Sequence, residues 1–405
     1  MKSLFRFRLS GYCRPLLGNG LMLLFSFALA GCLSPIGLEQ AVQGYNEVTT
    51  EILSKQLLAN IARVGRRLPP HFTGVTSIAA TFNFTVNAGA TPALTGNAGS
   101  LLMPIFGGSM SDNPTFSIIP IEGADFSKRL LNPMEEGKLT LLLRQYTDID
   151  LLLRLMAGEV RIEQEGQEVS YRNRPSHGEG YRLFRRIVLH LSSIQDRNHL
   201  YVEPLTFEQS WTLPVDRVTA EGFQALEKEY AVQYDSRQKV FQLSKQVEGR
   251  LLITNYDPDS LTNEERVRLN DIIEHNAPNE VAVDIRPGYP GGEYPISGEF
   301  RLRSFFNVLG FLGRDLEDER EYDVKPDPRT LPVRENPVHT MELMSSTLPI
   351  LGADPSVHVN GRFYALKGDK GYPWNRAAFL LLTTLYQMTV VDLPRFNTPA
   401  ITIAK

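Results

Sequence analysis

The sequence predicts an α+β fold in which helices and short, mostly antiparallel strands follow an N-terminal amphipathic helix. Helix-like and strand-like segments alternate irregularly, without the strand–helix–strand rhythm that builds a parallel sheet. The strongest strand signal is the alternation of apolar and small polar residues over Thr76–Ala88. The strongest helix signal is the apolar stripe at three-to-four spacing from about Glu39 to Arg66. No repeat of fixed period is visible.

Residues 1–31 have the parts of a secretory signal peptide. A basic stretch without acidic residues precedes the apolar run 21–30, and small residues end it. The apolar run is about half as long as the roughly 20 residues that a permanent transmembrane helix needs. We therefore expect residues 1–31 to be removed from the mature protein.

The next feature is the run Leu29-Ala30-Gly31-Cys32, which resembles the lipobox of bacterial lipoproteins. The resemblance implies cleavage between Gly31 and Cys32, a diacylglycerol on the sulfur of Cys32 and an acyl chain, such as palmitate, on its amine. Several acyl chains anchor a protein stably. In Gram-negative lipoproteins an Asp after the cysteine favours retention in the inner membrane, and this chain has Leu33 there. The resemblance therefore implies a lipid anchor in the outer membrane and a body in the periplasm. We expect no cofactor besides this covalent lipid on Cys32.

The charge balance excludes a concentrated basic surface of the kind that nucleic acid requires. The chain has 42 basic and 46 acidic residues, and the signal peptide removes four basic residues and no acidic one. The two cysteines are Cys13, which leaves with the signal peptide, and Cys32, which the lipid consumes. The mature chain then has no disulfide, no cysteine nucleophile and no thiolate metal site, so its stability must come from packing.

Residues 32–67 are predicted to hold the lipidated cysteine and the N-terminal helix, which Pro69-Pro70 ends. The simpler interpretation of this helix is an element packed on the core. The alternative is a helical stalk or an oligomer contact.

Residues 68–121 form an unusual β-rich segment, because no Asp, Glu, Lys or Arg occurs from Leu68 through Ser111 although charged residues make up 22% of the chain. A turn region, 89–99, follows the strand at Thr76–Ala88. The return stretch 101–106 is interrupted by Pro104, further breaks follow at 107–108 and 112–114, and another strand is expected over Thr115–Ile121.

Three interpretations of this charge-free segment stay open. It is a β-hairpin within the soluble fold, an oligomerisation arm that adds its strand to a neighbour, or a membrane-inserting hairpin of a barrel shared between subunits. Absent charges favour the second, because charged side chains usually protect strand edges. The length of the alternation fits the third, since a spanning strand needs about 9–11 residues. Pro104 and the scarcity of interfacial aromatic residues count against it.

Residues 122–314 are predicted to form the α+β body, and residues 341–405 to complete it with a strand and a helix. Residues 315–340 are charged and proline-rich, which is typical of a long surface loop or linker. The expected helices are 125–131, 135–146, 148–156, 179–194, 262–275, 300–312 and 375–388, and the expected strands are 160–163, 200–203, 230–234, 240–243, 251–254, 281–285 and 357–366.

No catalytic, cofactor-binding or metal site is predicted. The chain lacks the nucleophile elbow, the phosphate-binding loop and the dinucleotide fingerprint. The acidic pairs Glu122/Asp125 and Asp148/Asp150 could serve glycan hydrolysis, but acidic residues are common at helix starts. Asp257 and Asp259 begin like a calcium loop whose required glycine is missing, so we expect a turn there. The seven histidines have no metal-ligand spacing; they are His71, His177, His190, His199, His275, His339 and His358.

Four aromatic residues are notable. Tyr289 and Tyr294 lie in a Pro/Gly-rich loop, 286–292 and its continuation, that could contact a partner. Packing on the protein's own surface is the simpler interpretation. Trp211 and Trp374 are isolated and are expected in the core or at its edge.

The body resembles uncharacterised lipoproteins of Gram-negative bacteria in the stretches Asn60–Arg63, Asn113–Ser117, Pro120–Gly123 and Arg301–Ser304. This resemblance implies no activity. We therefore expect a structural, scaffold or assembly subunit of a cell-envelope complex, held to the membrane by its lipid and acting with a protein partner or a second copy, but not with nucleic acid. The alternative is a lipid-anchored periplasmic hydrolase acting on glycan, so the question of enzymatic activity stays open.

Overall fold

A computed structural model of the chain describes residues 39, 42–92, 102–145, 147–164 and 166–390, with the backbone alone for residues 75–117. The chain forms two units, residues 1–55 and residues 56–405. In the first, residues 42–55 are helical; in the second, residues 56–65 are helical, as the apolar stripe predicts. The expected signal peptide, its cleavage site at Gly31 and the expected lipidation at Cys32 lie outside the described residues.

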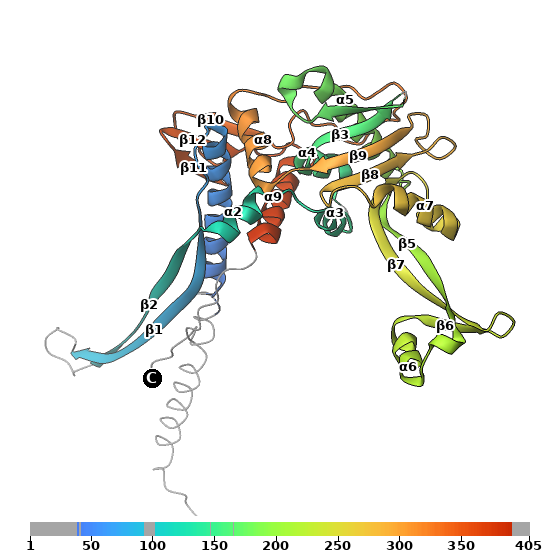
Figure 1. Ribbon diagram of the computed structural model, residues 1–405. Helices are drawn as coiled ribbons and strands as arrows, with labels where there is room; N and C mark the ends of the chain where they lie inside the picture. The colour runs from blue at the N-terminus through green and yellow to red at the C-terminus, as the bar shows by residue number, and fades with distance from the viewer. Residues whose placement is uncertain (1–38, 40–41, 93–101, 146, 165, 391–405) are drawn as a thin grey trace, which may run out of the picture. The chain divides into compact units, whose positions relative to one another are not determined.

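The second unit has an α+β fold (Figure 1). Its helices are α2 (Ala124–Leu131), α3 (Glu136–Leu143), α4 (Ile149–Met156), α5 (Glu179–Gln195), α6 (Ala220–Glu229), α7 (Asn263–Ile273), α8 (Phe305–Glu317) and α9 (Trp374–Val390). Its strands are β1 (Phe72–Pro92), β2 (Leu102–Ile121), β3 (Ala157–Gln164), β4 (Gln167–Arg172), β5 (Tyr201–Pro214), β6 (Ala231–Asp235), β7 (Val240–Thr254), β8 (Glu280–Ile285), β9 (Ile296–Leu302), β10 (Leu343–Ser346), β11 (Ser356–Val359) and β12 (Arg362–Leu366).

The body is built on a seven-stranded sheet in the order β4-β3-β9-β8-β7-β5, with β6 paired to β7. Only the β7–β8 pair of this sheet is parallel. A smaller sheet, β10-β12-β11, is antiparallel throughout. The prediction of mostly antiparallel strands is therefore confirmed.

Helices cover both faces of the seven-stranded sheet at β8, whose residues are nearly all buried. Phe300 of β9 pairs with Val281 of β8 and packs edge-on against Phe184 of α5, with ring centroids 6.2 Å apart. The next residue of β8, Ala282, must point to the other face, because alternate side chains of a strand point in opposite directions. There it packs with Ile273 of α7.

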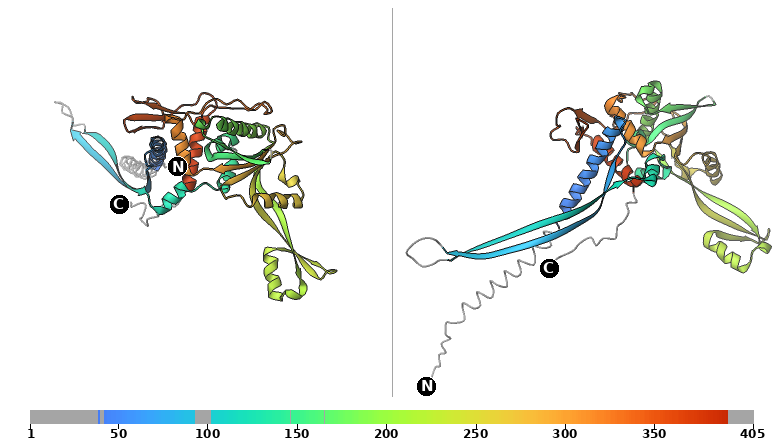
Figure 2. Two further views of the ribbon diagram at one scale, coloured as in Figure 1. Left: turned by 45° about the horizontal axis from the view of Figure 1, so that its top comes forward. Right: turned by 60° about the vertical axis from the view of Figure 1, so that its left-hand side comes forward.

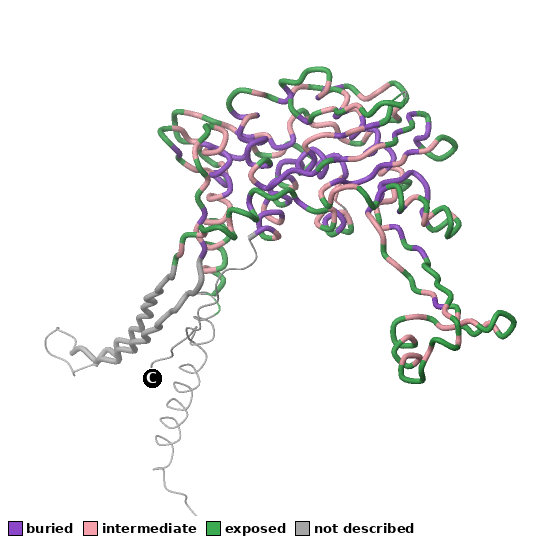
Figure 3. Tube along the Cα trace, viewed as in Figure 1, coloured by how far each residue is buried: buried purple, intermediate pink, exposed green. Residues whose placement is uncertain are grey.

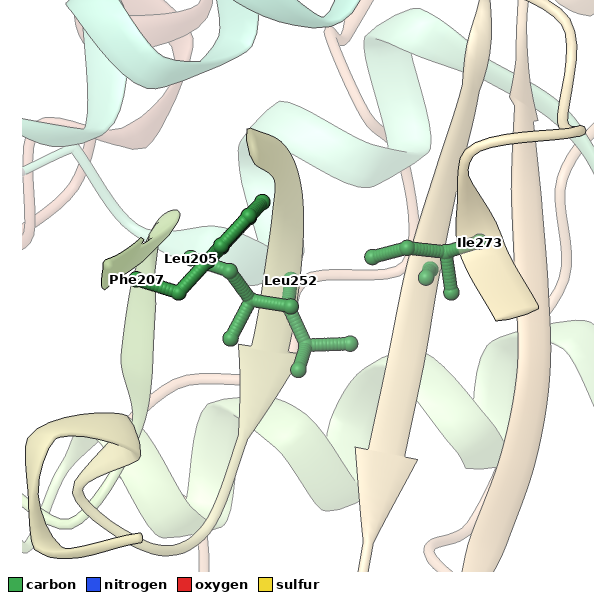
Figure 4. Packing of buried hydrophobic residues seen from close by; sticks show 5 residues of the cluster. Leu205, Phe207, Leu252 and Ile273 are labelled. Carbon is green, nitrogen blue, oxygen red and sulfur yellow. The ribbon is translucent and has the colours of Figure 1, made fainter. Parts of the chain in front are cut away.

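The cluster on the α7 face is compact. It consists of the buried residues Leu205, Phe207, Leu252, Ile273 and Ala282, supplied by β5, β7, α7 and β8 (Figure 4). Burying a Leu, Ile or Phe side chain contributes about 1.5–3 kcal/mol, so this cluster fixes the start of the β5–β7 ladder on the body.

The β5–β7 ladder continues far beyond the strands that the sequence predicts. The expected fragments 200–203, 240–243 and 251–254 are parts of two long strands that pair from Tyr201↔Thr254 to Pro214↔Val240. At the far end, β6 and α6 are joined to them, α6 has no buried residue, and most of this region is exposed (Figure 3). Trp211 lies there and is 44% exposed, so the prediction that it lies in the core or at its edge is wrong.

Two other predicted elements have different boundaries in the structure. The helix expected from Phe300 begins at Phe305, because Phe300 belongs to β9 and Ser304 caps the helix by accepting a hydrogen bond from the N–H of Asn307. The strand expected over 357–366 is a hairpin of β11 and β12, because Asn360 and Gly361 both adopt positive φ. Asn-Gly is the preferred sequence of such a two-residue turn.

Residues 318–342 contain no helix or strand, as expected for a long loop. They are nevertheless tied to the body rather than free as a linker, because the side chains of Glu321, Val324 and Thr340 are buried.

Candidate functional site

The hairpin of β1 and β2 is a two-stranded sheet of its own, separate from the other strands that the structure describes. Its strands have 21 and 20 residues, whereas an average strand has about five or six. They pair antiparallel from Phe72↔Ile121 to Pro92↔Leu102, with one irregularity between Val75 and Ser77 (Figure 2). The charge-free segment is therefore a long ladder.

The register gives this ladder two unlike faces, because directly paired residues share a face and the faces alternate along each strand. The apolar pairs on one face include Ile78↔Phe116, Phe84↔Met110 and Ala88↔Phe106, and the polar, uncharged pairs on the other are Thr81↔Asn113, Asn83↔Ser111 and Thr85↔Ser109. Asp112, the first charged residue of the segment, pairs with Phe82 on the apolar face. Both strands thus contribute to one amphipathic ribbon.

The expected breaks in the return strand are wrong. β2 runs unbroken through Pro104, Gly107-Gly108 and Pro114. A proline cannot donate a ladder hydrogen bond, but it fits an edge strand where its nitrogen points away from the partner. β2 is such an edge strand, because it pairs only with β1 in the described part of the chain.

A second candidate site is a groove of about 620 Å³. It lies between the start of α9 and the end of residues 318–342, which we call the irregular segment. Several of its charged groups have partners within the protein. Glu342 pairs with Lys367 at 2.5 Å between Oε1 and Nζ, and the carboxylate of Asp369 accepts hydrogen bonds from the backbone N–H groups of Asn375 and Arg376. The lining residues are Glu335, Asn336, Pro337, Val338, His339, Glu342, Lys367, Gly368, Asp369, Lys370, Tyr372, Trp374 and Asn375.

A buried ionic cluster lies next to this groove. Arg154 of α4 is fully buried, and its Nη2 donates to Glu321 Oε1 at 3.1 Å. Arg185 of α5 donates to Asp150 at 2.6 Å. Burial opposes the charge of Arg154, but the carboxylates of Glu321 and Asp150 hold its pKa above the ordinary value. Burial likewise opposes the charge of Glu321, and Arg154 keeps its pKa low. Arg154 and Glu321 therefore stay ionised.

One group of side chains in this cluster has the composition of a metal site. A carboxylate oxygen of Asp315, one of Glu321 and a ring nitrogen of His339 lie within 4.8 Å of one another. Protein donors already occupy them, however. Glu321 accepts from Arg154, from the hydroxyl of Tyr181 at 2.8 Å and from both the N–H and the hydroxyl of Thr340. A cation bound there would displace these donors and face the guanidinium of Arg154. The three side chains therefore suit a structural role better than a metal site.

The acidic pairs singled out in the sequence lie in different surroundings. Asp150 is buried and bound to Arg185, whereas Asp148 accepts a hydrogen bond from the hydroxyl of Tyr372. Glu122 and Asp125 are exposed at the start of α2.

The expected turn at Asp257 is confirmed. The carboxylate of Asp257 accepts from the N–H of Asp259, and Thr262 then opens α7 through a capping box with Glu265.

The loop tyrosines pack on the protein itself. Tyr294 is buried beside His190 and under the guanidinium of Arg329, and Tyr289 lies 5.3 Å from Tyr256 between ring centroids. Trp374 is buried, as predicted, and its indole N–H donates to the carbonyls of His339 and Thr340.

His339 makes the stability of the ionic cluster depend on pH. The hydrogen bond to Asp315, 3.0 Å from Nδ1 to Oδ1, raises the pKa of His339 above its ordinary value despite partial burial. Its stabilisation is therefore complete below the unfolded pKa of about 6.5 and is lost as pH rises through the raised folded value. We expect His339→Gln to lower the free energy of unfolding by about 1 kcal/mol at pH 6 and by less at pH 9, measured by urea unfolding.

The matched control for this prediction is His275→Gln, because His275 is exposed at the end of α7. It should change the unfolding free energy equally at the two pH values. An equal loss at pH 6 and pH 9 in His339→Gln would show that the imidazolium–Asp315 pair does not stabilise the fold.

Comparisons with protein families, with curated proteins and with solved structures find no match to this chain. Among the described residues, no helix combines the length and the apolar character needed to cross a membrane.

Proposed function

We propose that this chain is an outer-membrane-anchored periplasmic lipoprotein that acts as a structural, scaffold or assembly subunit of a cell-envelope complex through its β1–β2 hairpin. The observation that carries the proposal is the ladder itself: two strands of about 20 residues, amphipathic and uncharged over most of their length. The Cys32 lipobox supports the membrane anchor.

Such a hairpin is suited to association. An isolated two-stranded hairpin is marginally stable in water, and three or more strands or a covered apolar face are needed for independent stability. Exposed strand edges template pairing with another chain unless charge, proline or a bulge protects them. From Phe72 to Pro92, β1 carries no charged residue. Association through an edge would give it a partner and add strands to the two-stranded sheet.

The alternative, a lipid-anchored hydrolase acting on glycan, has weaker support. It requires two carboxyl groups facing each other across a site, roughly 5–9.5 Å apart. At the groove, Glu342 and Asp369 are instead engaged by protein donors. In the cluster, Glu321 and Asp150 are engaged in the same way.

The test is the native mass of the detergent-extracted, lipidated protein beside a variant in which a short Gly/Ser turn replaces residues 76–117. This variant keeps the pair Val75↔Ile118 at the base of the hairpin. We expect the full chain to form a higher-mass assembly and the variant to fall to the monomer mass, because the hairpin is the associating element.

The matched control removes the other exposed extension. A short turn joining Pro214 to Val240, which are directly paired, deletes α6 and β6. It should leave the number of subunits in the assembly unchanged. A Cys32→Ser variant should lose the lipid and leave the outer-membrane fraction. A monomer mass for both the full chain and the hairpin variant would contradict the proposal.

A further inference from the structure

The two outer edges of the hairpin are not equivalent. In an antiparallel ladder the N–H and C=O of every second residue point away from the partner strand. β2 pairs continuously, so its prolines must occupy the outward positions. Pro104, Pro114 and Pro120 are all an even number of residues apart and thus belong to this outward set. The outer edge of β2 consequently lacks N–H donors at three positions.

The outer edge of β1 has all of its N–H donors over its central part. Directly paired residues point the same way, so the partners of the β2 prolines identify the outward set of β1: Ala80 pairs with Pro114, and Ala90 with Pro104. Every second residue from Ile78 to Ala90 therefore offers both an N–H and a C=O outward, because none of them is proline.

We propose that the outer edge of β1 pairs antiparallel with the same edge of a second copy of this chain, about a two-fold axis at Phe84. This inference rests on the proposed function and names the partner and the contact. Phe84 is the midpoint of the uninterrupted edge from Ile78 to Ala90, so a two-fold there uses its whole length. The contact is isologous, like most symmetric dimer interfaces.

The register centred on Phe84 meets the requirements of both hydrogen bonding and side-chain placement. Hydrogen bonding must place outward residues of one copy opposite outward residues of the other, and the outward set of β1 is the apolar set of the alternation. In the register centred on Phe84, Phe82 is opposite Val86 and Ala80 is opposite Ala88. Directly paired residues share a face, so the apolar faces of the two hairpins become one continuous surface. A slip by one residue would break both relations.

A head-to-tail contact between β1 and β2 would be poorer. Carbonyl groups of the β1 edge would then face Pro104 and Pro114, which cannot donate to them. A closed ring of subunits needs such heterologous contacts, whereas a two-fold dimer does not.

The test is cysteine cross-linking in the lipidated full-length protein. Phe84→Cys places the new thiol on the two-fold axis, opposite its own copy, and paired Cα atoms about 5.5 Å apart suit a disulfide. Apart from the predicted lipid-bearing Cys32 and the signal-peptide Cys13, the chain has no cysteine. We expect Phe84→Cys to form a covalent dimer on oxidation, and the unsubstituted protein to form none.

The matched control is Met110→Cys, because Met110 pairs directly with Phe84 on the other edge of the hairpin. It should not cross-link to itself. Co-expressed Ala80→Cys and Ala88→Cys chains should cross-link to each other far more than either does alone, which would fix the register. Preferential cross-linking of Phe84→Cys chains to Met110→Cys chains would overturn the inference in favour of a head-to-tail assembly.

A second measurement does not depend on thiols. Ala88→Pro removes one outward N–H of β1 in each copy and should weaken the dimer about tenfold or more, whereas Gly108→Pro, on the outer edge of β2, should leave it unchanged. An oligomeric full chain that fails the Phe84 and Ala88 tests would overturn this inference and leave the proposed function standing. A monomeric full chain would overturn both.

Discussion

Replacing Arg154 by methionine is expected to lower the free energy of unfolding by about 3–5 kcal/mol, the usual cost of removing one partner from a buried ion pair. The side chain of Arg154 is fully buried, and it donates to Glu321, to the hydroxyl of Thr340 and to the carbonyls of Pro337 and Val338. Methionine fills similar space but leaves the Glu321 carboxylate buried beside fewer donors. The expected loss is therefore mainly the cost of an uncompensated charge.

Urea unfolding followed by circular dichroism measures this loss. The matched control is Arg182→Met on α5, whose ion pair with Glu179 is half-exposed. Exposed pairs contribute about 0–1 kcal/mol, so the control should remain close to the unsubstituted protein. Similar unfolding free energies for the two variants would mean that Arg154 does not tie the irregular segment to the body.

Replacing Gly313 by alanine should destabilise the second unit by about 2 kcal/mol, because α8 and the helix of residues 56–65 touch backbone to backbone. A Cβ at Gly313 would lie 2.6 Å from the Cα of Gly65 and 2.6 Å from the carbonyl oxygen of Ile61. These are main-chain atoms, so the helices themselves must separate. Overpacking of this kind costs about 1–3 kcal/mol.

Gly310 provides a control on the same helix. A Cβ there would meet its nearest neighbour, the Nη1 atom of the flexible Arg314 side chain, at 3.4 Å, and Val64 at 3.7 Å. Alanine favours a helix over glycine by up to about 1 kcal/mol, so Gly310→Ala should be neutral or stabilising. Opposite signs for the two variants, measured as unfolding midpoints in urea, are the expected result. A stabilising Gly313→Ala would contradict the close approach.

The elements that the sequence predicts best are those whose evidence is local. The helices expected over 179–194, 262–275 and 375–388 correspond to α5, α7 and α9. Local evidence predicts the wrong element where strand pairing determines the structure. Pro104 looks like a break, yet an open edge accommodates it. Phe300 resembles the start of a helix, yet it lies in β9 between β3 and β8. The Asn360-Gly361 pair, by contrast, is a local signal for the turn that joins β11 and β12.

The ionic cluster could not be predicted from the sequence, because its members come from distant segments. Glu321 lies in a proline-rich, charged stretch that resembles a free linker, and no periodicity marks it as buried. Arg154 sits among leucines in α4, where an arginine would ordinarily face water. The two faces of the hairpin were predictable on β1 from its alternation. On β2 they became visible only with the register, since prolines and glycines obscure its pattern.

The distance along the chain between Arg154 and Glu321 has a consequence for the order of folding. The two residues are separated by 167 positions, and closing so long a loop costs chain entropy before any contact compensates it. Glu321 can reach Arg154 only when the stretch 318–342 has docked on the body. The ionic centre is therefore complete only after these two distant parts of the chain have come together.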